Sequence, residues 1–430
     1  MNLLLVFAAG LIGFMFAGLH IGSAIYMVGW IGDATGGGIL SAMMGNLAWT
    51  TMNEFLLVAV PLFILLGEIL LRSGVADRMY GALAEWLRWL PGGLLHTNIA
   101  ACALFAATSG SSVATAATIG TVGMPAFKNR GYNERLILGS IAAGGTLGIL
   151  IPPSLNMIVY GAMTGASVGR LFVAGIIPGI ILTLMMSGII IVISLAMRSD
   201  RTPEAMLPLA ARLKLLLHLL PVFGIFFVIM GSIYLGIATP TEAAALGVVG
   251  ALGIAAAMRR LSIAMLHEAF LSTVRTTAMV VLVIVAAFIL NFVLSFLGLP
   301  QSIANWIQDQ GLSPYQTIWL LLVFYLILGC FLEAISMMVT TLGIVVPLIV
   351  SMGFDPVWFG IFITVLCELA LITPPVGLNL YVVQSIRTTR GSMNDVFIGT
   401  LPFSLAMLLF LTLLIYFPGI ALWLPNLMFE

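Results

Sequence analysis

The sequence Gly148-Ile-Leu-Ile-Pro-Pro-Ser154 recurs 222 residues later as Ala370-Leu-Ile-Thr-Pro-Pro-Val376. Both proline pairs lie inside long hydrophobic stretches. Proline lacks a backbone N–H and its ring displaces the preceding turn, so each pair interrupts an α-helix. Pro125 and Pro347 keep the same spacing of 222 residues. The chain therefore contains two copies of a unit with a discontinuous helix, a pattern typical of secondary transporters.

The composition indicates a polytopic membrane protein. Hydrophobic residues make up 61% of the 430 residues, charged residues make up 7%, and the mean hydropathy is +1.19. Soluble domains contain about 25% charged residues. Lys and Arg together number 16, as do Asp and Glu, so net charge gives no indication of nucleic acid or an acidic partner.

The sequence gives no support for an enzyme or for nucleotide-driven or redox chemistry. It has no G-x-x-x-x-G-K-[ST] motif, and its four histidines lack the spacing of transition-metal ligands. Cys102, Cys330 and Cys367 each lie in an apolar run, where buried free thiols are expected. We therefore expect no cofactor, and energy from an ion gradient or a partner.

The hydrophobic segments predict many membrane crossings, because a spanning helix needs about 20 apolar residues. Full spans are expected near residues 3–29, 52–71, 135–165, 171–197, 215–236, 241–258, 276–297, 357–386 and 396–424. Two further apolar stretches, 93–127 and 316–350, are too long for one crossing and are interrupted midway. We interpret them as re-entrant hairpins that enter and leave the membrane on one side.

The predicted fold class is an all-α polytopic membrane protein with an inverted-topology repeat, two re-entrant hairpins and two discontinuous helices. The units are 1–51 (scaffold), 52–200 (first repeat), 201–273 (scaffold) and 274–430 (second repeat). Within the scaffold units, 36–51 and 259–273 are expected to form helices in the membrane interface. These helices are expected to be arms that join a fixed scaffold to a mobile core.

Basic residues predict the orientation of each repeat. Those that flank the first hairpin are Arg72, Arg78, Arg88, Lys128, Arg130 and Arg135. The positive-inside rule therefore places both ends of this hairpin in the cytoplasm. The segments around the second hairpin, 298–315 and 351–356, contain no Lys or Arg, so it enters from outside. Continued along the chain, the rule leaves only Arg170 on the outer side, and the two repeats run in opposite directions.

The interruptions free backbone carbonyls at mid-membrane depth, where an unsatisfied polar group is costly. Sodium suits carbonyl and hydroxyl oxygens, and hydroxyl groups occur near the interruptions at Ser109, Ser111, Ser112, Ser154 and Thr373. Small residues that permit close backbone approach are Gly110, Gly148, Gly329, Ala370 and Gly377. The sequence predicts two sodium sites; the alternative is that these residues only pack helices together.

Glu333 and Glu368 are the acidic residues deepest in the predicted membrane segments. Ionisable groups at that depth are costly and usually functional. Glu333 lies at the tip of the second hairpin, where it could orient substrate or titrate. A hydrogen-bonded structural carboxyl is an equally good interpretation of Glu333.

An ordered set of motifs resembles a known family over nearly the whole chain. The motifs are Gly110-Ser-Ser-Val-Ala-Thr115, Met124-Pro-Ala-Phe127, Leu171-Phe-Val-Ala-Gly-Ile-Ile-Pro-Gly179, Ala238-Thr-Pro-Thr-Glu-Ala-Ala244 and Ile372-Thr-Pro-Pro-Val-Gly-Leu-Asn379. Together they resemble the large membrane subunit of the tripartite ATP-independent periplasmic (TRAP) transporters. The resemblance implies an elevator-type architecture of the ion-transporter superfamily, sodium-driven import, and a bacterial inner-membrane location.

The resemblance also implies partners and substrates. In this family, large subunits work with a small four-helix membrane subunit and a periplasmic substrate-binding protein. They import organic acids such as C4-dicarboxylates, sialic acid and sugar acids. The first span, which has no basic segment before it, is expected to be retained rather than cleaved as a signal. The small subunit is expected to be a separate protein.

The resemblance assigns the family's two sodium sites and its substrate site to the matching positions of this sequence. The first sodium is expected at Ser109, Gly110, Ser111, Ser112, Gly148, Ile151 and Ser154. The second is expected at Gly329, Leu332, Glu333, Ala370, Thr373, Val376 and Gly377. Substrate is expected near Ser111, Ser112, Glu333, Pro153, Pro375 and Asn379. Glu333 departs from the family, which more often has Asp there, and this puts substrate selectivity in doubt.

Two other functions remain open at the level of sequence. One is a self-sufficient sodium/dicarboxylate symporter that needs no binding protein. The other is an assembly subunit that conducts nothing, although paired hairpins would have no purpose in it. No membrane-embedded Arg marks a carboxylate clamp, so the substrate itself is not predicted.

Overall fold

A computed structural model describes residues 2–36, 43–128, 130–197 and 207–429. Regular secondary structure in these residues is entirely helical, which confirms the all-α prediction for this part of the chain. The first half contains α1 (Asn2–Phe16), α2 (Ile21–Gly36), α3 (Met44–Met52), α4 (Ala59–Ser73), α5 (Val75–Leu87), α6 (Leu94–Ser109), α7 (Ser112–Gly123), α8 (Glu134–Thr146), α9 (Leu155–Thr164) and α10 (Val168–Ala196).

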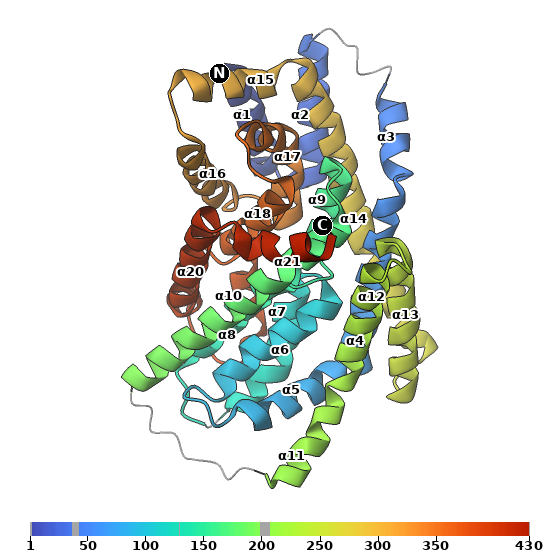
Figure 1. Cartoon of the computed structure of the whole chain (residues 1–430), viewed down its shortest axis with the longest axis vertical. Helices are drawn as coiled ribbons and strands as arrows, with labels where there is room; N and C mark the ends of the chain where they lie inside the picture. The colour runs from blue at the N-terminus through green and yellow to red at the C-terminus, as the bar shows by residue number, and fades with distance from the viewer. Residues whose placement is uncertain (1, 37–42, 129, 198–206, 430) are drawn as a thin grey trace.

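The second half repeats this order (Figure 1). It contains α11 (Leu209–Leu215), α12 (Leu220–Tyr234), α13 (Pro240–Ala257), α14 (Ile263–Phe296), α15 (Leu299–Asp309), α16 (Pro314–Leu328), α17 (Ala334–Ser351), α18 (Pro356–Leu371), α19 (Leu378–Ile386), α20 (Met393–Tyr416) and α21 (Gly419–Phe429). At a spacing close to 222 residues, α1 corresponds to α12, α2 to α13, and α5 through α10 to α15 through α20. The repeat thus also includes helices that the sequence analysis assigned to the scaffold.

Two predicted spans are each divided into two helices. The span expected over 3–29 is α1 and α2, because Gly18 adopts φ 84° and the backbone turns before His20, whose Nδ1 accepts from the N–H of Gly22. The span expected over 396–424 is α20 and α21, and Pro418 lies at the junction, where it cannot continue a helix. Both predictions of a single continuous span were wrong.

The second arm, predicted as an interfacial helix over 259–273, is helical but does not end before the span expected at 276–297. From Ile263 onward this segment is the first part of α14, a helix of 34 residues that continues through the span expected at 276–297. Residues 263–296 contain neither Gly nor Pro, so nothing ends the helix between arm and span. In the first repeat α3 and α4 are separate, and residues 37–42 of the predicted arm at 36–51 lie outside the described residues.

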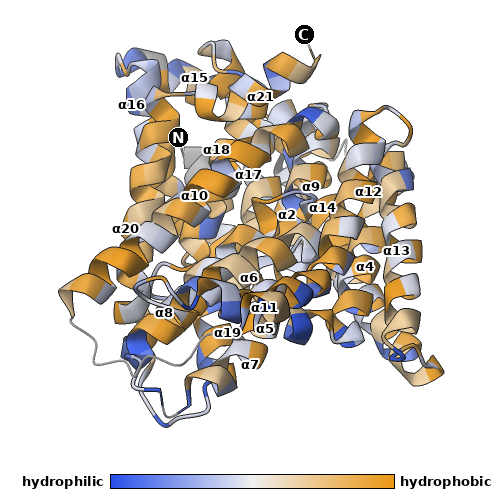
Figure 2. Cartoon of the chain, turned by 60° about the horizontal axis from the view of Figure 1, so that its bottom comes forward, coloured by the Kyte–Doolittle hydropathy of each residue, from blue (hydrophilic) through white to orange (hydrophobic). Residues whose placement is uncertain are grey.

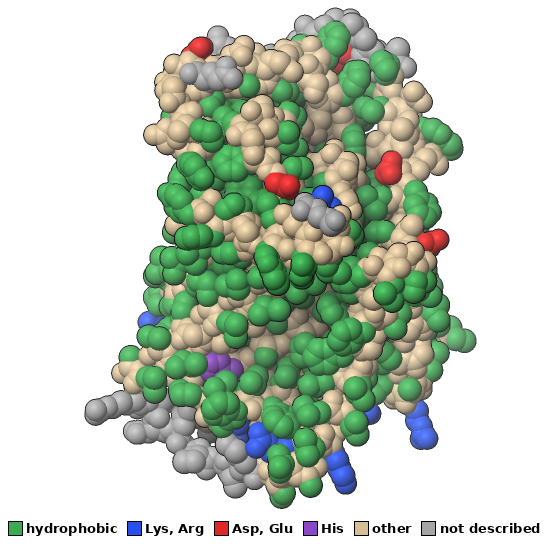
Figure 3. Space-filling view, in the orientation of Figure 1, with side chains coloured by type: hydrophobic (Ala, Val, Ile, Leu, Met, Phe, Trp, Pro, Cys, Tyr) green, Lys and Arg blue, Asp and Glu red, His purple; other side chains and the backbone are tan. Residues whose placement is uncertain are grey.

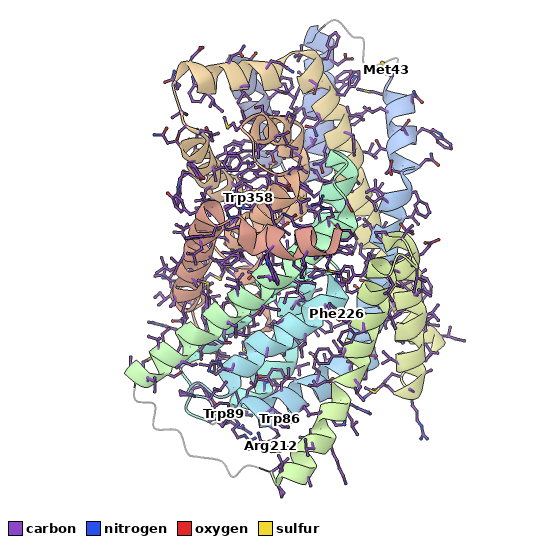
Figure 4. All side chains as sticks on the ribbon, in the orientation of Figure 1. Met43, Trp86, Trp89, Arg212, Phe226 and Trp358 are labelled. Atoms are coloured by element: carbon purple, nitrogen blue, oxygen red, sulfur yellow. The ribbon has the colours of Figure 1, made fainter. Side chains whose placement is uncertain are left out.

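Two amphipathic helices, α5 and α15, occupy equivalent places in segments outside the predicted spans and hairpins. Each follows a long apolar helix and precedes a hairpin. Trp86 on α5 donates its indole N–H to the carbonyl of Arg212 on α11 at 3.0 Å, and the Arg212 guanidinium lies 4.7 Å from the Trp86 ring (Figure 4). This contact joins α5, within the first repeat, to α11, which precedes the first helix of the second repeat.

Six helical segments of the described chain are long and apolar enough to cross a membrane alone, and the bent pair ending in α12 could be a seventh. Figure 2 shows hydrophobic residues over most of the helices and hydrophilic residues near the ends of the molecule. In Figure 3 the visible Lys and Arg side chains lie mainly at the end that carries α5 and α11. This distribution agrees with the orientation predicted from the basic residues.

The helices that follow the hairpins pack closely across the two repeats. On α8, Gly139 meets the backbone carbonyl of Gly399 on α20, so no side chain fits between these helices. On α18, Trp358 stacks between Phe354 and Phe362 with ring centroids 5.0 and 5.4 Å away. The Trp358 indole N–H donates to the carbonyl of Leu414 on α20 at 2.9 Å. Backbone contact and aromatic packing therefore fix α8 and α18 against α20.

An ion-pair cluster joins the two repeats at the ends of α8, α19 and α20. Arg387 donates from Nε and Nη2 to the two carboxylate oxygens of Glu134 at 2.9 and 2.8 Å, and it also contacts Asp395 at 3.3 Å. Arg135 donates to the other oxygen of Asp395 at 3.0 Å. The Arg387 hydrogen bonds hold the pKa of Glu134 below its ordinary value of 4.5, so the cluster is charged at neutral pH.

Glu134→Gln is expected to destabilise the protein in a pH-dependent way. A carboxylate with a depressed pKa contributes stability above its unfolded pKa, and that contribution disappears as pH falls through the folded value. The variant should melt about 2 °C below the wild type at pH 7. The difference should shrink between about pH 5 and about pH 3. Glu54→Gln, at an exposed acid without a capping bond, is the control; a difference that stays constant with pH would contradict the assignment.

Gly139→Ala is expected to disrupt the contact between α8 and α20. Its new Cβ would meet the Gly399 carbonyl, which belongs to the backbone and cannot rotate away. Loss of about 4 kcal/mol or more is expected for such overpacking. Gly188→Ala, within α10, meets nothing within 4 Å and should be neutral or slightly stabilising. Thermal melting in detergent measures both, and equal melting temperatures would show that α8 and α20 can separate freely.

Candidate functional site

The hairpin junctions meet the helix interruptions in the middle of the fold. We call the junctions tip 1 (residues 109–112, between α6 and α7) and tip 2 (329–333, between α16 and α17). We call the interruptions break 1 (147–154, between α8 and α9) and break 2 (370–377, between α18 and α19). All of the predicted site residues except Asn379 lie in these four segments.

Tip 1 contacts break 1 through backbone atoms. Gly110 turns the chain with φ 59° and Ser111 caps α7 by accepting from the N–H of Ala114. A Cβ on Gly148 would lie 2.6 Å from the carbonyl oxygen of Ser111, and one on Gly110 would lie 3.3 Å from that of Pro153. The predicted neighbourhood of the first site is therefore present, and glycine is required on both sides of the contact.

Tip 2 meets break 2 in the corresponding way. A Cβ on Gly329 would collide with the Ala370 side chain and lie 3.2 Å from its Cα. The Cys330 sulfur lies 4.0 Å from the carbonyl oxygen of Pro374. Gly329 and Cys330 of tip 2 thus lie close to Ala370 and Pro374 of break 2.

Glu333 occupies the N-cap of α17. Its carboxylate accepts hydrogen bonds from the N–H of Ile335 at 3.2 Å, the N–H of Ser336 at 2.8 Å and the Ser336 hydroxyl at 2.7 Å. A carboxylate at a helix N-terminus is also stabilised by the helix dipole. This arrangement matches the structural alternative of the sequence analysis and holds the beginning of α17 at tip 2.

Several predicted hydroxyl ligands already have hydrogen-bond partners. Ser154 caps α9 by accepting from the N–H of Met157, and Thr373 donates to the carbonyl of Leu369 at 2.6 Å. The Ser109 hydroxyl lies 2.7 Å from that of Thr115. These three hydroxyl groups are therefore engaged in hydrogen bonds within the fold. In break 1 the carbonyl of Gly148 cannot accept the usual helical bond, because the residue four positions later is Pro152.

The two breaks differ in exposure, although their sequences match. Pro153 and Ser154 in break 1 are buried, with Ser154 at 0% exposure. Pro375 and Val376 in break 2 are exposed, with Val376 at 42%. The two repeats thus differ at their proline pairs, because the pair in break 1 is buried and the pair in break 2 is exposed.

The short helices after the breaks cross over between the repeats. α9 of the first repeat packs against α17 of the second, and α19 of the second packs against α7 of the first. The hydroxyl of Ser112 at tip 1 donates to a carboxylate oxygen of Glu368, which lies just before break 2. The sequence marks Glu368 as a deep acidic residue but does not indicate its partner. Ser112 and Glu368 are 256 residues apart, and such a separation leaves no local signal.

Asn156 is a candidate that the sequence analysis missed. It is the third residue after the first proline pair, as Asn379 is the fourth after the second, with Gly377 as the extra residue. Asn156 and Asn379 are 1% and 0% exposed. Neither Asn156 Nδ2 nor the side-chain N and O atoms of Asn379 have a partner within the described chain. The shared Leu-Asn after each proline pair was the available signal.

Comparison with known proteins agrees with this architecture. A solved structure of the YdaH transporter from Alcanivorax borkumensis aligns with a TM-score of 0.60 at 16% identity, over 91% of this chain and 90% of that one. This likeness concerns the fold alone. The shared fold covers almost the whole chain.

Sequence comparison identifies the family. The C4-dicarboxylate TRAP transporter large permease of Pseudomonas aeruginosa is 36% identical over 87% of each chain. The sialic acid TRAP transporter large permease of Vibrio cholerae is 29% identical over 97% of each. Residues 1–420 match the model of the tripartite ATP-independent periplasmic transporter, DctM component. The chain therefore belongs to the DctM family, the large permease subunits of TRAP transporters.

Proposed function

We propose that this chain is the sodium-coupled permease subunit of a transporter that imports a small organic acid by an elevator motion. Family membership carries the proposal, and it argues against a self-sufficient symporter or a non-conducting assembly subunit. The substrate would be a C4-dicarboxylate, sialic acid or sugar acid, delivered by a periplasmic binding protein. A small membrane subunit would complete the complex in a bacterial inner membrane.

Oxygen-rich contacts at the two tips support the coupling to sodium. In the first site the Ser111 and Pro153 carbonyls face the backbone of the opposite segment, within the approach that Gly148 and Gly110 permit. In the second site Gly329 and Ala370 allow the same approach. Sodium would be held by carbonyl oxygens in both, and the tips would become ordered when it binds.

The unequal exposure of the breaks supports alternating access. If each repeat can adopt either conformation, exchange of the two conformations would bury break 2 and expose break 1. Substrate held near Asn156 and Asn379 would then pass from one side of the membrane to the other. The Arg170 guanidinium donates to Asn426 on α21 at 3.2 Å.

An interface between two groups of helices supports the elevator. Helices α2, α4, α13 and α14 pack against one another and would form the scaffold, with the hairpins and broken helices as the moving core (Figure 1). Gly67 on α4 approaches Ser109 of tip 1, where a Cβ would lie 3.3 Å from its Cα. Asn291 on α14 donates to the Val339 carbonyl on α17 at 3.2 Å. These contacts would have to break when the core slides.

Glu333→Gln is expected to weaken sodium dependence. Glutamine has one acceptor oxygen, so α17 loses part of its cap and tip 2 is less well ordered. Half-maximal uptake into liposomes should need about tenfold more sodium, which corresponds to about 1.4 kcal/mol and the loss of one charged hydrogen bond.

The control is Glu242→Gln. Glu242 accepts a hydrogen bond of 2.8 Å from the N–H of Thr239 at the beginning of α13. Like Glu333 it is a carboxylate that caps a helix, but it belongs to neither tip. Its sodium dependence should match the wild type. Unchanged sodium dependence in Glu333→Gln would remove tip 2 from the coupling mechanism.

A crosslink between Asn291→Cys and Gly343→Cys is expected to stop transport. A Cβ on Gly343 lies 2.9 Å from that of Asn291, near enough to be bridged after a small adjustment. In a Cys330→Ser background, oxidation should abolish uptake and reduction should restore it. Gly250→Cys with Ile225→Cys joins α13 to α12 without bridging α14 to α17, and is the matched control. Full uptake by the oxidised first pair would refute movement of α17 along α14.

A further inference from the structure

The Glu368 side chain connects segments of the two repeats that have separate roles. It projects from α18 two residues before Ala370, the residue of break 2 that meets Gly329 at tip 2. Its carboxylate accepts the hydroxyl proton of Ser112 at tip 1. The Glu368 side chain thus contacts tip 1, while α18, the helix that carries it, contacts tip 2.

This hydrogen bond is not part of local helix capping. The N-cap of α7 is Ser111, which leaves the Ser112 hydroxyl available for a contact with another element. Glu368 lies inside α18 rather than at its first turn. The bond therefore fixes the beginning of α7 relative to α18, across 256 residues of sequence.

The environment of Glu368 makes this contact costly to keep without a role. The residue is 1% exposed, and its second carboxylate oxygen has no hydrogen-bond partner within the described chain. Buried polar atoms are nearly always paired, and acidic residues inside membrane segments are rare and usually functional. A hydrophobic residue would fill the same space without an unpaired oxygen.

We propose that Glu368 is a positioning residue that couples the two sodium sites. The inference rests on the proposed function, since it requires a cation at each tip. Ordering of tip 1 by sodium holds Ser112 in place, Ser112 holds Glu368, and α18 carries that position to Ala370 and tip 2. Movement of tip 1 would leave the buried carboxylate without its hydrogen bond. The two tips are therefore ordered together, and sodium binds cooperatively.

Cys330 provides a native reporter at tip 2. It is half-buried, whereas Cys102 and Cys367 are fully buried. The experiment measures the rate of maleimide labelling of Cys330 in the complete transporter in liposomes, as a function of sodium concentration. Labelling is assigned to Cys330 by mass spectrometry. In the wild type, sodium should protect Cys330 from maleimide steeply. The Hill coefficient of this protection should be about 2, because two sodium sites are coupled.

Glu368→Met keeps the volume but removes the acceptor, so protection should become non-cooperative, with a Hill coefficient of about 1. Glu368→Gln retains an acceptor for Ser112 and should restore cooperativity. Thr364→Val is the matched control, because the Thr364 hydroxyl lies one turn away on α18 and donates to Gly360 of the same helix at 2.7 Å. It should behave like the wild type.

Ser112→Ala removes the same bond from the opposite side and provides a second test should Glu368→Met fail to fold. It should also lower the Hill coefficient to about 1. If wild-type Cys330 labelling does not respond to sodium, the proposed function fails. If the wild type responds without cooperativity, or if either variant that removes the bond remains cooperative, the assignment of Glu368 is overturned.

Discussion

The proline pairs impose the constraint on which the rest of this structure depends. Each pair removes two backbone donors inside a hydrophobic segment and leaves carbonyl groups that no continuing helix can satisfy. A hairpin tip packs against each break, through Gly110 and Gly148 in one repeat and Gly329 in the other. Under the proposed function, the oxygen atoms brought together by this backbone contact would hold the cation. The proposed site would therefore depend on interrupted secondary structure more than on polar side chains.

Much of this arrangement could be predicted from sequence, because its signals are local. Proline pairs, glycines and a constant spacing located the breaks, the tips and their pairing. The end of a helix was harder to predict where no Gly or Pro marks it. Residues 263–296 contain neither, so α14 continues from the predicted arm into the predicted span. A single Gly18 with positive φ divides α1 from α2. Contacts between distant residues, such as Ser112 with Glu368, could not be predicted because they depend on tertiary packing.

The two halves share a backbone plan but differ in chemistry. Tip 1 carries three serines, whereas tip 2 has Glu333, whose carboxylate is occupied with the N-terminus of α17. Break 1 is buried and break 2 is open. The ion-pair cluster around Arg387 joins the repeats at one end, and the residues at the equivalent positions, Gly165 for Arg387 and Pro356 for Glu134, cannot form its counterpart. Under the proposed mechanism, inverted geometry would permit exchange of conformations, and these side chains would make the two conformations unequal in energy.

The crossover of α9 onto α17 and of α19 onto α7 has a consequence for how such a protein arises and folds. Neither repeat can complete its own core, because the short helix that follows the break in each repeat packs against the other repeat. During synthesis the face of α9 that packs against α17 cannot make this contact until α17 has been made, so this part of the core closes late. A gene encoding a single repeat would have needed two copies of its product, inserted in opposite directions, to bury the same surfaces. Duplication and fusion would then have converted an antiparallel homodimer into one chain.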